Sequence, residues 1–214
     1  MPAPPSFRIV HGLPAPLQAA AARLYWQAFG RQILPLPLPR GEMLLRHAMR
    51  PARALAALDP CGGLIGLAGL RDASGGFIEA SPDAFGVAFG AMGGVLRALV
   101  DTLYRPGPES PDMVLDGIVI RPDRRRQGVG RALILCAARH AAAQGYPGLR
   151  VELDAGNDNA AELYRGLGFQ PVAQLRIGWP WSPRAAIMRL PGATHPPVQD
   201  RPRHPASPSS EPEA

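Results

Sequence analysis

The sequence predicts an α/β fold, an α+β sandwich in which helices flank one mixed central sheet. Segments with alternating apolar residues, typical of strands, interleave with segments of helical spacing along residues 7–190. The chain has 214 residues, of which 46% are hydrophobic, enough for one sizeable core but cramped for two domains. We therefore expect one domain over residues 1–190.

The first part of the chain is expected to form short strands around two helices. The predicted elements are a strand at 7–10, helices at 16–29 and 42–49, and strands at 52–57 and 64–70. The helix at 16–29 rests on Leu17, Ala20, Ala21, Leu24 and Ala28, which recur at helical spacing. Prolines at 35, 37 and 39 predict an extended loop over 33–39 between the helices.

A long connection, residues 73–112, separates the third predicted strand from the fourth and is expected to be a helical insertion. Ser81 is suited to cap a helix that starts at Pro82. Apolar residues then repeat in steps of four and three to make one stripe: Phe85, Phe89, Met92, Leu96, Leu99 and Leu103. Glycines at 86, 90 and 94 form a second ridge that would let a neighbouring backbone come close. Core packing is favoured over a lid or a dimer contact.

The second half continues the alternation. We expect strands at 113–120, 149–153, 172–177 and 185–190, with helices at 127–143 and 159–166. Gly117 interrupts the first of these strands and indicates a β-bulge. Residues 191–214 are rich in proline, serine and charge, which predicts a disordered tail.

Composition narrows the class of partner. The formal net charge is +6 and every basic side chain except histidine is arginine, which indicates a biased genome more than a polyanion-binding surface. Cys61 and Cys136 are far apart and have no metal-ligand spacing, so neither a disulfide framework nor a metal site is expected. The apolar run at 84–96 is too short to span a bilayer, and residues 1–10 lack a signal-peptide pattern. We expect a cytoplasmic protein without a nucleic-acid or membrane partner.

The most informative run is residues 115–133, in which a strand, an arginine-rich turn, two glycines and a helix start follow in direct succession. A helix N-terminus offers unpaired backbone N–H groups, and glycines let a phosphate approach them closely. Arg124, Arg125 and Arg126 add positive charge at the same place. The pattern predicts a site for a diphosphate or a similar anion.

Arg125-x-x-Gly128-x-Gly130, preceded by Ile120-Arg121-Pro122, resembles the acyl-CoA-binding signature of the GNAT superfamily of N-acetyltransferases. Leu153-x-x-x-Asn157-x-x-Ala160-x-x-Leu163-Tyr164-x-x-x-Gly168-Phe169 is similar to the strand, loop and helix that follow in that family. The resemblance is specific over residues 113–170 and looser elsewhere. It implies a GNAT-like sheet and transfer of an acetyl group from acetyl-CoA, the co-substrate, to a primary amine of a small molecule or peptide. No metal is implied, and a homodimer is left open.

The resemblance also implies residue roles. Backbone N–H groups from Arg126 to Arg131 would hold the pyrophosphate, and β-strand backbone at Ile118 and Ile120 would pair with the pantetheine arm. An N–H at or near Ile120 would stabilise the oxyanion that forms during attack. The cofactor-binding residues expected are Ile118, Val119, Ile120, Arg125, Arg126, Gln127, Gly128, Val129, Gly130, Arg131, Asn157 and Tyr164.

Two residues are assigned to the chemistry. Tyr164 is expected to act as the general acid toward the departing thiolate, the alternative being an aromatic ring packed on the sheet. Asp116 is the candidate general base, the alternative being a structural carboxylate; Glu79, Glu152 and Asp154 are further candidates. Trp179 and Trp181 wall an acceptor pocket or simply pack. A sensor that binds acyl-CoA without turnover is the competing function, followed by arginine-mediated nucleic-acid binding.

Overall fold

The computed structural model describes residues 6–33 and 38–192. Its seven-stranded sheet has the order β1-β2-β3-β4-β5-β7-β6. The strands are β1 (Arg8–His11), β2 (Ala54–Leu58), β3 (Leu64–Arg71), β4 (Met113–Ile120), β5 (Gly148–Asp154), β6 (Gln170–Arg176) and β7 (Arg184–Pro191). The α-helices are α1 (Gln18–Ile33), α2 (Leu38–Ala48), α3 (Pro82–Phe89), α4 (Gly93–Leu103), α5 (Val129–Ala143) and α6 (Asp158–Arg165). This confirms the predicted mixed sheet with flanking helices.

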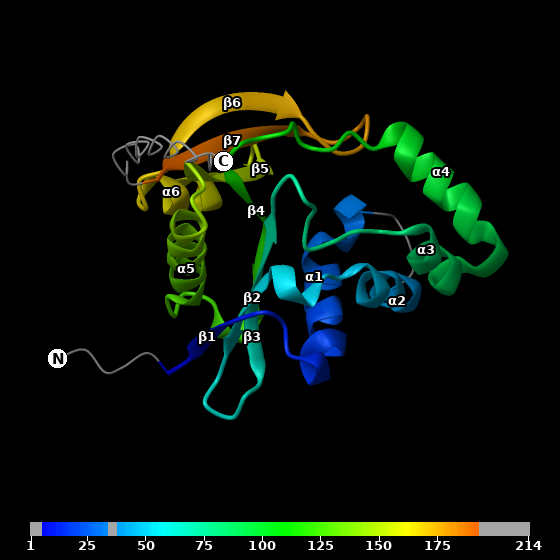
Figure 1. Cartoon of the computed structure of the whole chain (residues 1–214), viewed down its shortest axis with the longest axis horizontal. Coiled ribbons are helices and arrows are strands. Elements are labelled where there is room, and N and C mark those ends of the chain that lie inside the picture. Colours follow the sequence, from blue (N-terminus) through cyan, green and yellow to red (C-terminus); the bar gives the residue numbers. More distant parts are fainter. Residues whose placement is uncertain (1–5, 34–37, 193–214) are drawn as a thin grey trace, which may run out of the picture.

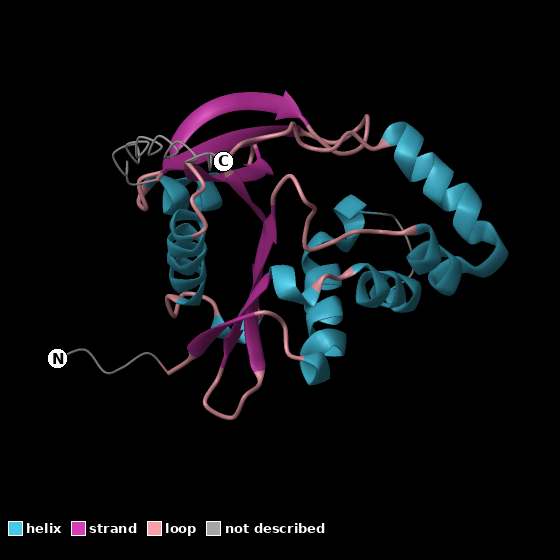
Figure 2. Ribbon diagram, in the orientation of Figure 1, coloured by secondary structure: helices cyan, strands magenta, loops and turns pink. Residues whose placement is uncertain are grey.

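Helices cover the two faces of the sheet in separate groups (Figures 1 and 2). On one face, α5 and α6 pack through Leu133, Ile134 and Tyr164 against alternate residues of the central strands. On the other face, α1, α2 and α3 build the second core, which contains Trp26 and Phe85. Because strand side chains alternate, each central strand contributes to both cores.

The sheet opens in its middle. β4 and β5 are parallel and paired only at Met113↔Leu149, Val114↔Arg150 and Leu115↔Val151. From Asp116 onward, β4 has no partner on that side within the described residues, although its other edge stays paired with β3. One extra residue of β4 lies between the pairs Leu70↔Leu115 and Ala68↔Ile118, and Gly117 has φ +86°. The predicted bulge at Gly117 therefore lies where the two strands separate.

Gly117 is required there for two reasons. Its positive φ is a conformation that L side chains rarely adopt, and a Cβ would lie 2.6 Å from the hydroxyl oxygen of Tyr25. That hydroxyl donates a 3.0 Å hydrogen bond to the backbone carbonyl of Asp116. The contact from α1 thus fixes the point at which β4 leaves β5.

The insertion is helical, as expected, but it is not one continuous helix. Gly90, at φ +58°, ends α3, and a short 3₁₀ turn at Gly90–Met92 leads into α4. The close backbone approach occurs at Gly93, whose added Cβ would lie 2.6 Å from the carbonyl oxygen of Phe85. At Gly86 and Gly94 an added Cβ meets no described atom within 4 Å, so the predicted glycine ridge does not pack.

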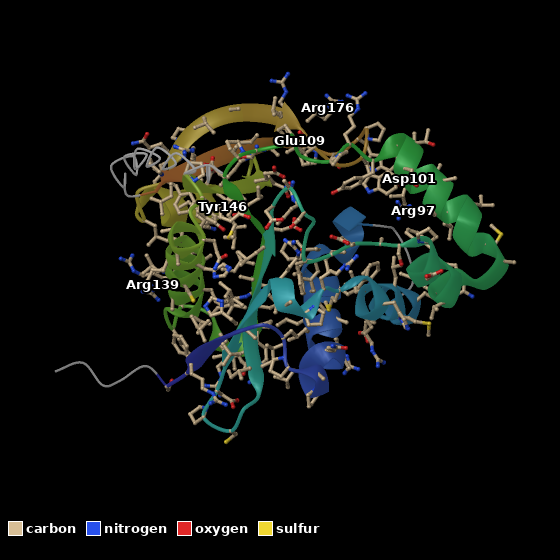
Figure 3. All side chains as sticks on the ribbon, in the orientation of Figure 1. Arg97, Asp101, Glu109, Arg139, Tyr146 and Arg176 are labelled. Atoms are coloured by element: carbon tan, nitrogen blue, oxygen red, sulfur yellow. The ribbon has the colours of Figure 1, made fainter. Side chains whose placement is uncertain are left out.

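The bend divides the predicted apolar stripe. Phe85 and Phe89 are buried, whereas Met92 and Leu99 are 58% and 47% exposed, so the expectation of core packing fails for them. The segment Pro82–Leu103 is long and apolar enough to cross a membrane by length and composition. It is divided, however, into helices of 8 and 11 residues, and a membrane span needs about 20. Figure 3 shows Arg97 and Asp101 on the side of α4 that faces the molecule.

The connection between the first two helices is shorter than predicted. α1 runs to Ile33 and α2 begins at Leu38, so the loop expected over 33–39 loses both ends to helices. Pro39 is compatible with this because a helix does not need the N–H groups of its first turn. Residues 34–37 lie outside the described part. The tail predicted at 191–214 lies outside it from residue 193 onward, while Pro191 ends β7.

Candidate functional site

The turn between β4 and α5 forms a cradle of backbone N–H groups. α5 begins at Val129, and its first intrahelical bond beyond the turn is from Ala132 N to the carbonyl of Gly128, which leaves the preceding amides without intrahelical acceptors. Arg126 and Gly128 have φ values of +61° and +81°. An added Cβ at Gly128 would meet no atom of the described chain within 4 Å. The backbone is therefore turned toward open space.

A cavity of about 650 Å³ occupies that space. Its lining comprises Ile120, Arg124, Arg125, Arg126, Gly128, Val129, Gly130, Arg131, Asn159, Glu162 and Leu163. Arg121 is held away by two hydrogen bonds to Asp123, of 2.7 and 2.6 Å. Arg124 Nε lies 3.7 Å from the same carboxylate and is buried without a hydrogen-bond partner in the described chain. Amides, the helix dipole and several guanidinium groups thus converge on one cavity, which fits a diphosphate.

The free edge of β4 extends from this cradle toward Asp116. Arg121 N donates to Ile65 O at 2.9 Å, so residues 121 and 65 form a hydrogen-bonded pair of the antiparallel ladder. Since such pairs alternate, Ile118 and Ile120, opposite Ala68 and Gly66, direct their N–H and C=O groups away from β3. Arg125 Nε reaches Ile120 O from that side at 3.3 Å. These groups can pair with an extended ligand chain.

A second cavity, of about 310 Å³, adjoins the same strand on the face that carries α1 and α2. Its lining comprises Tyr25, Leu44, Arg71, Ile78, Ala80, Phe85, Val100, Tyr104, Pro106, Gly107, Asp116, Glu152 and Ile177. Arg71, Asp116 and Glu152 come from three adjacent strands, β3, β4 and β5. The rest is mainly apolar, and the insertion supplies one wall. We call this cavity the acceptor pocket.

Asp116, the predicted base, is one of two carboxylates that line the acceptor pocket. Its side chain is 31% exposed, and its nearest cation is Arg71, with Nε 3.8 Å from Oδ1. No hydrogen bond to its carboxylate is found within residues 6–33 and 38–192. Burial raises the pKa of Asp116; the positive charge of Arg71 opposes this shift, and Glu152 adds to it. A carboxylate with unused acceptor capacity and a raised pKa is suited to receive a proton.

Glu152 is engaged differently. Arg71 Nη2 lies 3.2 Å from one of its oxygens, and Arg150 Nη2 lies 2.6 Å from the other. Arg150 is itself buried and also donates to the carbonyl of Pro108 at 3.3 Å. Glu152 therefore holds Arg71 in place, and its two oxygens are occupied, in contrast to those of Asp116.

The outer wall of the acceptor pocket is tied to the β6–β7 connection. Arg105 and Gly178 exchange two backbone hydrogen bonds of 2.9 and 2.7 Å, and their neighbours Tyr104 and Ile177 line the pocket. Trp179 is buried and meets the ring of Tyr104 edge-on at 5.7 Å. Trp181 is 69% exposed and stacks on Trp179. The tryptophans therefore support the wall from behind and do not line the cavity.

Five predicted site residues lie outside both cavity linings: Ile118 and Val119 on the edge of β4, and Gln127, Asn157 and Tyr164. Tyr164 is 3% exposed and packs edge-on against Phe169 at 5.0 Å, and burial raises the pKa of its phenol well above the ordinary value. Asn157 caps α6 by accepting a hydrogen bond from Ala160 N at 3.2 Å. Gln127 donates to the carbonyl of Asp123 at 3.2 Å. Their catalytic or cofactor-binding roles stay predictions.

Among the alternative bases, Glu79 is paired with Arg50 and accepts from Gly76 N, and Asp154 is exposed. Sequence reasoning missed Arg71, Tyr25 and Tyr104, which line the acceptor pocket. The sequence did contain an indication of Arg71. It is a charged residue at the end of an otherwise apolar strand, so its side chain points to the opposite face from that of its neighbour Leu70, which enters the core. Within the described ranges no cluster of three or more His, Cys, Asp or Glu is arranged to hold a metal ion.

Comparison with known proteins identifies a family. The model of the acetyltransferase (GNAT) family matches residues 21–169, which include strands β3, β4 and β5 and the glycine turn before α5. No curated protein matches the chain by sequence.

Solved structures share the fold. The ribosomal-protein-S18-alanine N-acetyltransferase from Escherichia coli has 17% identity and a TM-score of 0.53, with 91% of this chain and 99% of that chain covered. Ard1 from Thermoplasma volcanium has 16% identity and a TM-score of 0.56, over 88% and 99% of the two chains. A GCN5-related N-acetyltransferase from Kribbella flavida has 17% identity and a TM-score of 0.55, over 87% and 98%. At these identities the similarity shows the fold alone.

Proposed function

The chain belongs to the GNAT acetyltransferase family, and from that premise and its two cavities we propose that it transfers an acetyl group from acetyl-CoA directly to a primary amine. One observation supports this most strongly. A single strand, β4, leads from Asp116 in its middle to the arginine-rich amide cradle that follows its C-terminal end. Between them lies an edge without a strand partner on the β5 side, within the described chain.

The donor would lie along this line. The cradle from Arg126 to Arg131 would bind the diphosphate through backbone amides, and the outward groups of Ile118 and Ile120 would pair with the pantetheine amides as an added strand. This alignment carries the thioester to the gap that opens beyond the pair Leu115↔Val151. An N–H of the same strand edge is then available to the oxyanion.

The acceptor would enter from the other cavity as an ammonium ion. Asp116 removes a proton, directly or through a water molecule, and the amine lone pair attacks the thioester carbonyl carbon. A C–N bond forms and the C–S bond breaks, so the products are an amide and a thiol. The second proton that the amine loses goes to the departing thiolate, which gives the thiol. The phenol of Tyr164, which stays protonated because its pKa is raised, would donate a hydrogen bond to the sulfur or relay this proton to it. Its buried position would require the pantetheine sulfur to come close to the ring.

The test is release of the coenzyme thiol from acetyl-CoA in the presence of a panel of primary amines. Mass spectrometry should identify the acetylated amine and coenzyme A in equal amounts, which avoids the background that the exposed thiol of Cys61 gives with thiol reagents. Binding of coenzyme A without any amine-dependent thiol release would contradict the proposal and favour a sensor. A cytoplasmic location belongs to the same proposal.

A further inference from the structure

The walls of the acceptor pocket restrict the body of the amine. Three rings, those of Tyr25, Phe85 and Tyr104, line it together with aliphatic side chains such as Val100. Its volume of about 310 Å³ lies at the lower end of the range of roughly 300–1,000 Å³ that ligand pockets span. Such walls favour a compact, apolar group, and an aromatic ring gains additional contact with rings that meet it edge-on or offset.

The charges of the pocket restrict the polar groups of the amine. Asp116 can receive one ammonium group, since no described residue donates a hydrogen bond to its carboxylate. Arg71 is already shared by Asp116 and Glu152, at 3.8 and 3.2 Å. A carboxylate on the acceptor would have to displace one of these and would lie beside like charges. Both oxygens of Glu152 are engaged, so a second ammonium would also lack a free partner.

The outer wall restricts the size of what can enter. Tyr104 and Ile177 stand next to the two backbone hydrogen bonds that join Arg105 to Gly178. Tyr104 is also supported by the buried ring of Trp179. Opening this side would break two hydrogen bonds and a ring contact, which disfavours a bulky acceptor such as a folded protein.

On the basis of the proposed function, we propose that the acceptor is a compact arylalkyl primary amine with one positive charge and no carboxylate. The ammonium group lies at Asp116, and the ring lies among Tyr25, Phe85 and Tyr104. The insertion that supplies Phe85, Val100 and Tyr104 is then the element that determines specificity.

The experiment compares kcat/KM for four amines with the full chain and acetyl-CoA. The amines are 2-phenylethylamine, phenylalanine, putrescine and a short peptide with a free N-terminus. We expect 2-phenylethylamine to be preferred at least about 10-fold, since differences of a single apolar group are worth 10- to 200-fold and unpaired polar groups more. Faster transfer to any of the other three would overturn the inference while leaving the proposed function intact. Coenzyme binding with no transfer to any amine would overturn both.

A variant locates the ring. Val100→Phe places extra volume in the acceptor pocket. Val95→Phe makes the same change on the outside of α4, where the side chain of Val95 is 63% exposed. We expect Val100→Phe to raise KM for 2-phenylethylamine about 10-fold or more, and to raise it more than KM for ethylamine, with the affinity for coenzyme A unchanged. Val95→Phe should change none of these. Equal KM values for 2-phenylethylamine in the two folded variants would overturn the inference, and the wild-type comparison does not depend on either variant.

Discussion

Replacing Gly128 with aspartate tests the diphosphate cradle most sharply. A side chain at this position projects from the start of α5 into the cavity that the arginines line, and it meets no described atom within 4 Å. The substitution therefore adds a negative charge where the diphosphate should lie. The positive φ of +81° costs about 1–2 kcal/mol for an ordinary residue, and aspartate and asparagine tolerate it better than most.

The size of the effect follows from Coulomb's law. Two unit charges about 5 Å apart in an effective dielectric constant of about 20 repel by roughly 3 kcal/mol. Since about 1.4 kcal/mol is a tenfold change, one phosphate charge alone predicts a loss of about 200-fold in coenzyme A affinity. Gly128→Asn is the matched control, because it has nearly the same shape and backbone tolerance without the charge.

Isothermal titration calorimetry of coenzyme A with the wild type and both variants is the assay. Gly128→Asp should bind about 200-fold more weakly than Gly128→Asn, and the difference should shrink at high salt because exposed charges are screened. Thermal unfolding of the two variants should be similar. Equal coenzyme affinity of the two variants would refute the reasoning, since the charge would then lie away from the diphosphate.

The remaining predictions concern the base, the acid, the bulge and a histidine pair. Asp116→Asn should lower kcat/KM about 10²-fold or more and remove the acidic limb of its pH profile, which the raised pKa places above the ordinary carboxyl range. Folding raises the pKa of Asp116, so the protein loses stability as pH rises from the unfolded pKa of about 3.8 through the folded pKa. Asp116→Asn should therefore have a higher Tm than the wild type at pH 7. An unchanged Tm would speak against a desolvated carboxylate. Tyr164→Phe should slow turnover about 10-fold or more with coenzyme affinity nearly intact, and wild-type turnover would leave Tyr164 a packing residue. Gly117→Ala should lower the free energy of unfolding by about 2–3 kcal/mol, a Tm decrease of roughly 5–10 °C, and adding Tyr25→Phe should recover part of this loss. A Tm for Gly117→Ala within about 1–2 °C of the wild type would exclude the close contact between residue 117 and the Tyr25 hydroxyl. Burial and the neighbouring His11 lower the pKa of His140. The neutral imidazole therefore contributes stability above the unfolded pKa of about 6.5, and this stability is lost as pH falls through the folded pKa. His140→Gln should make the decrease in Tm between pH 7 and pH 5 smaller than in the wild type.

The sequence predicts the parts of the site that lie close together along the chain. Residues 113–131 supply a strand, a bulge, an arginine turn and a helix start, each with its own local signal. β4 has the predicted bounds, Met113–Ile120, because apolar residues with a single glycine favour a strand with a bulge. The cradle depends on glycine and on helix geometry, both of which can be recognised in a short run of residues.

The acceptor pocket could not be assembled in the same way. Its lining comes from residues between Tyr25 and Ile177, and only the fold brings them together. Glu152 was among the further candidates for the base, but nothing in the local sequence shows that Arg71 holds it. The bend at Gly90 was missed because glycines four apart also suit a helix ridge, and only the left-handed φ at Gly90 separates the two cases.

A crystal structure of the chain with coenzyme A tests the central claim most directly. The account predicts diphosphate oxygens within about 3 Å of the backbone nitrogens between Arg126 and Arg131, and pantetheine amides paired with Ile118 and Ile120. A diphosphate bound elsewhere, with those amides facing solvent, would contradict it.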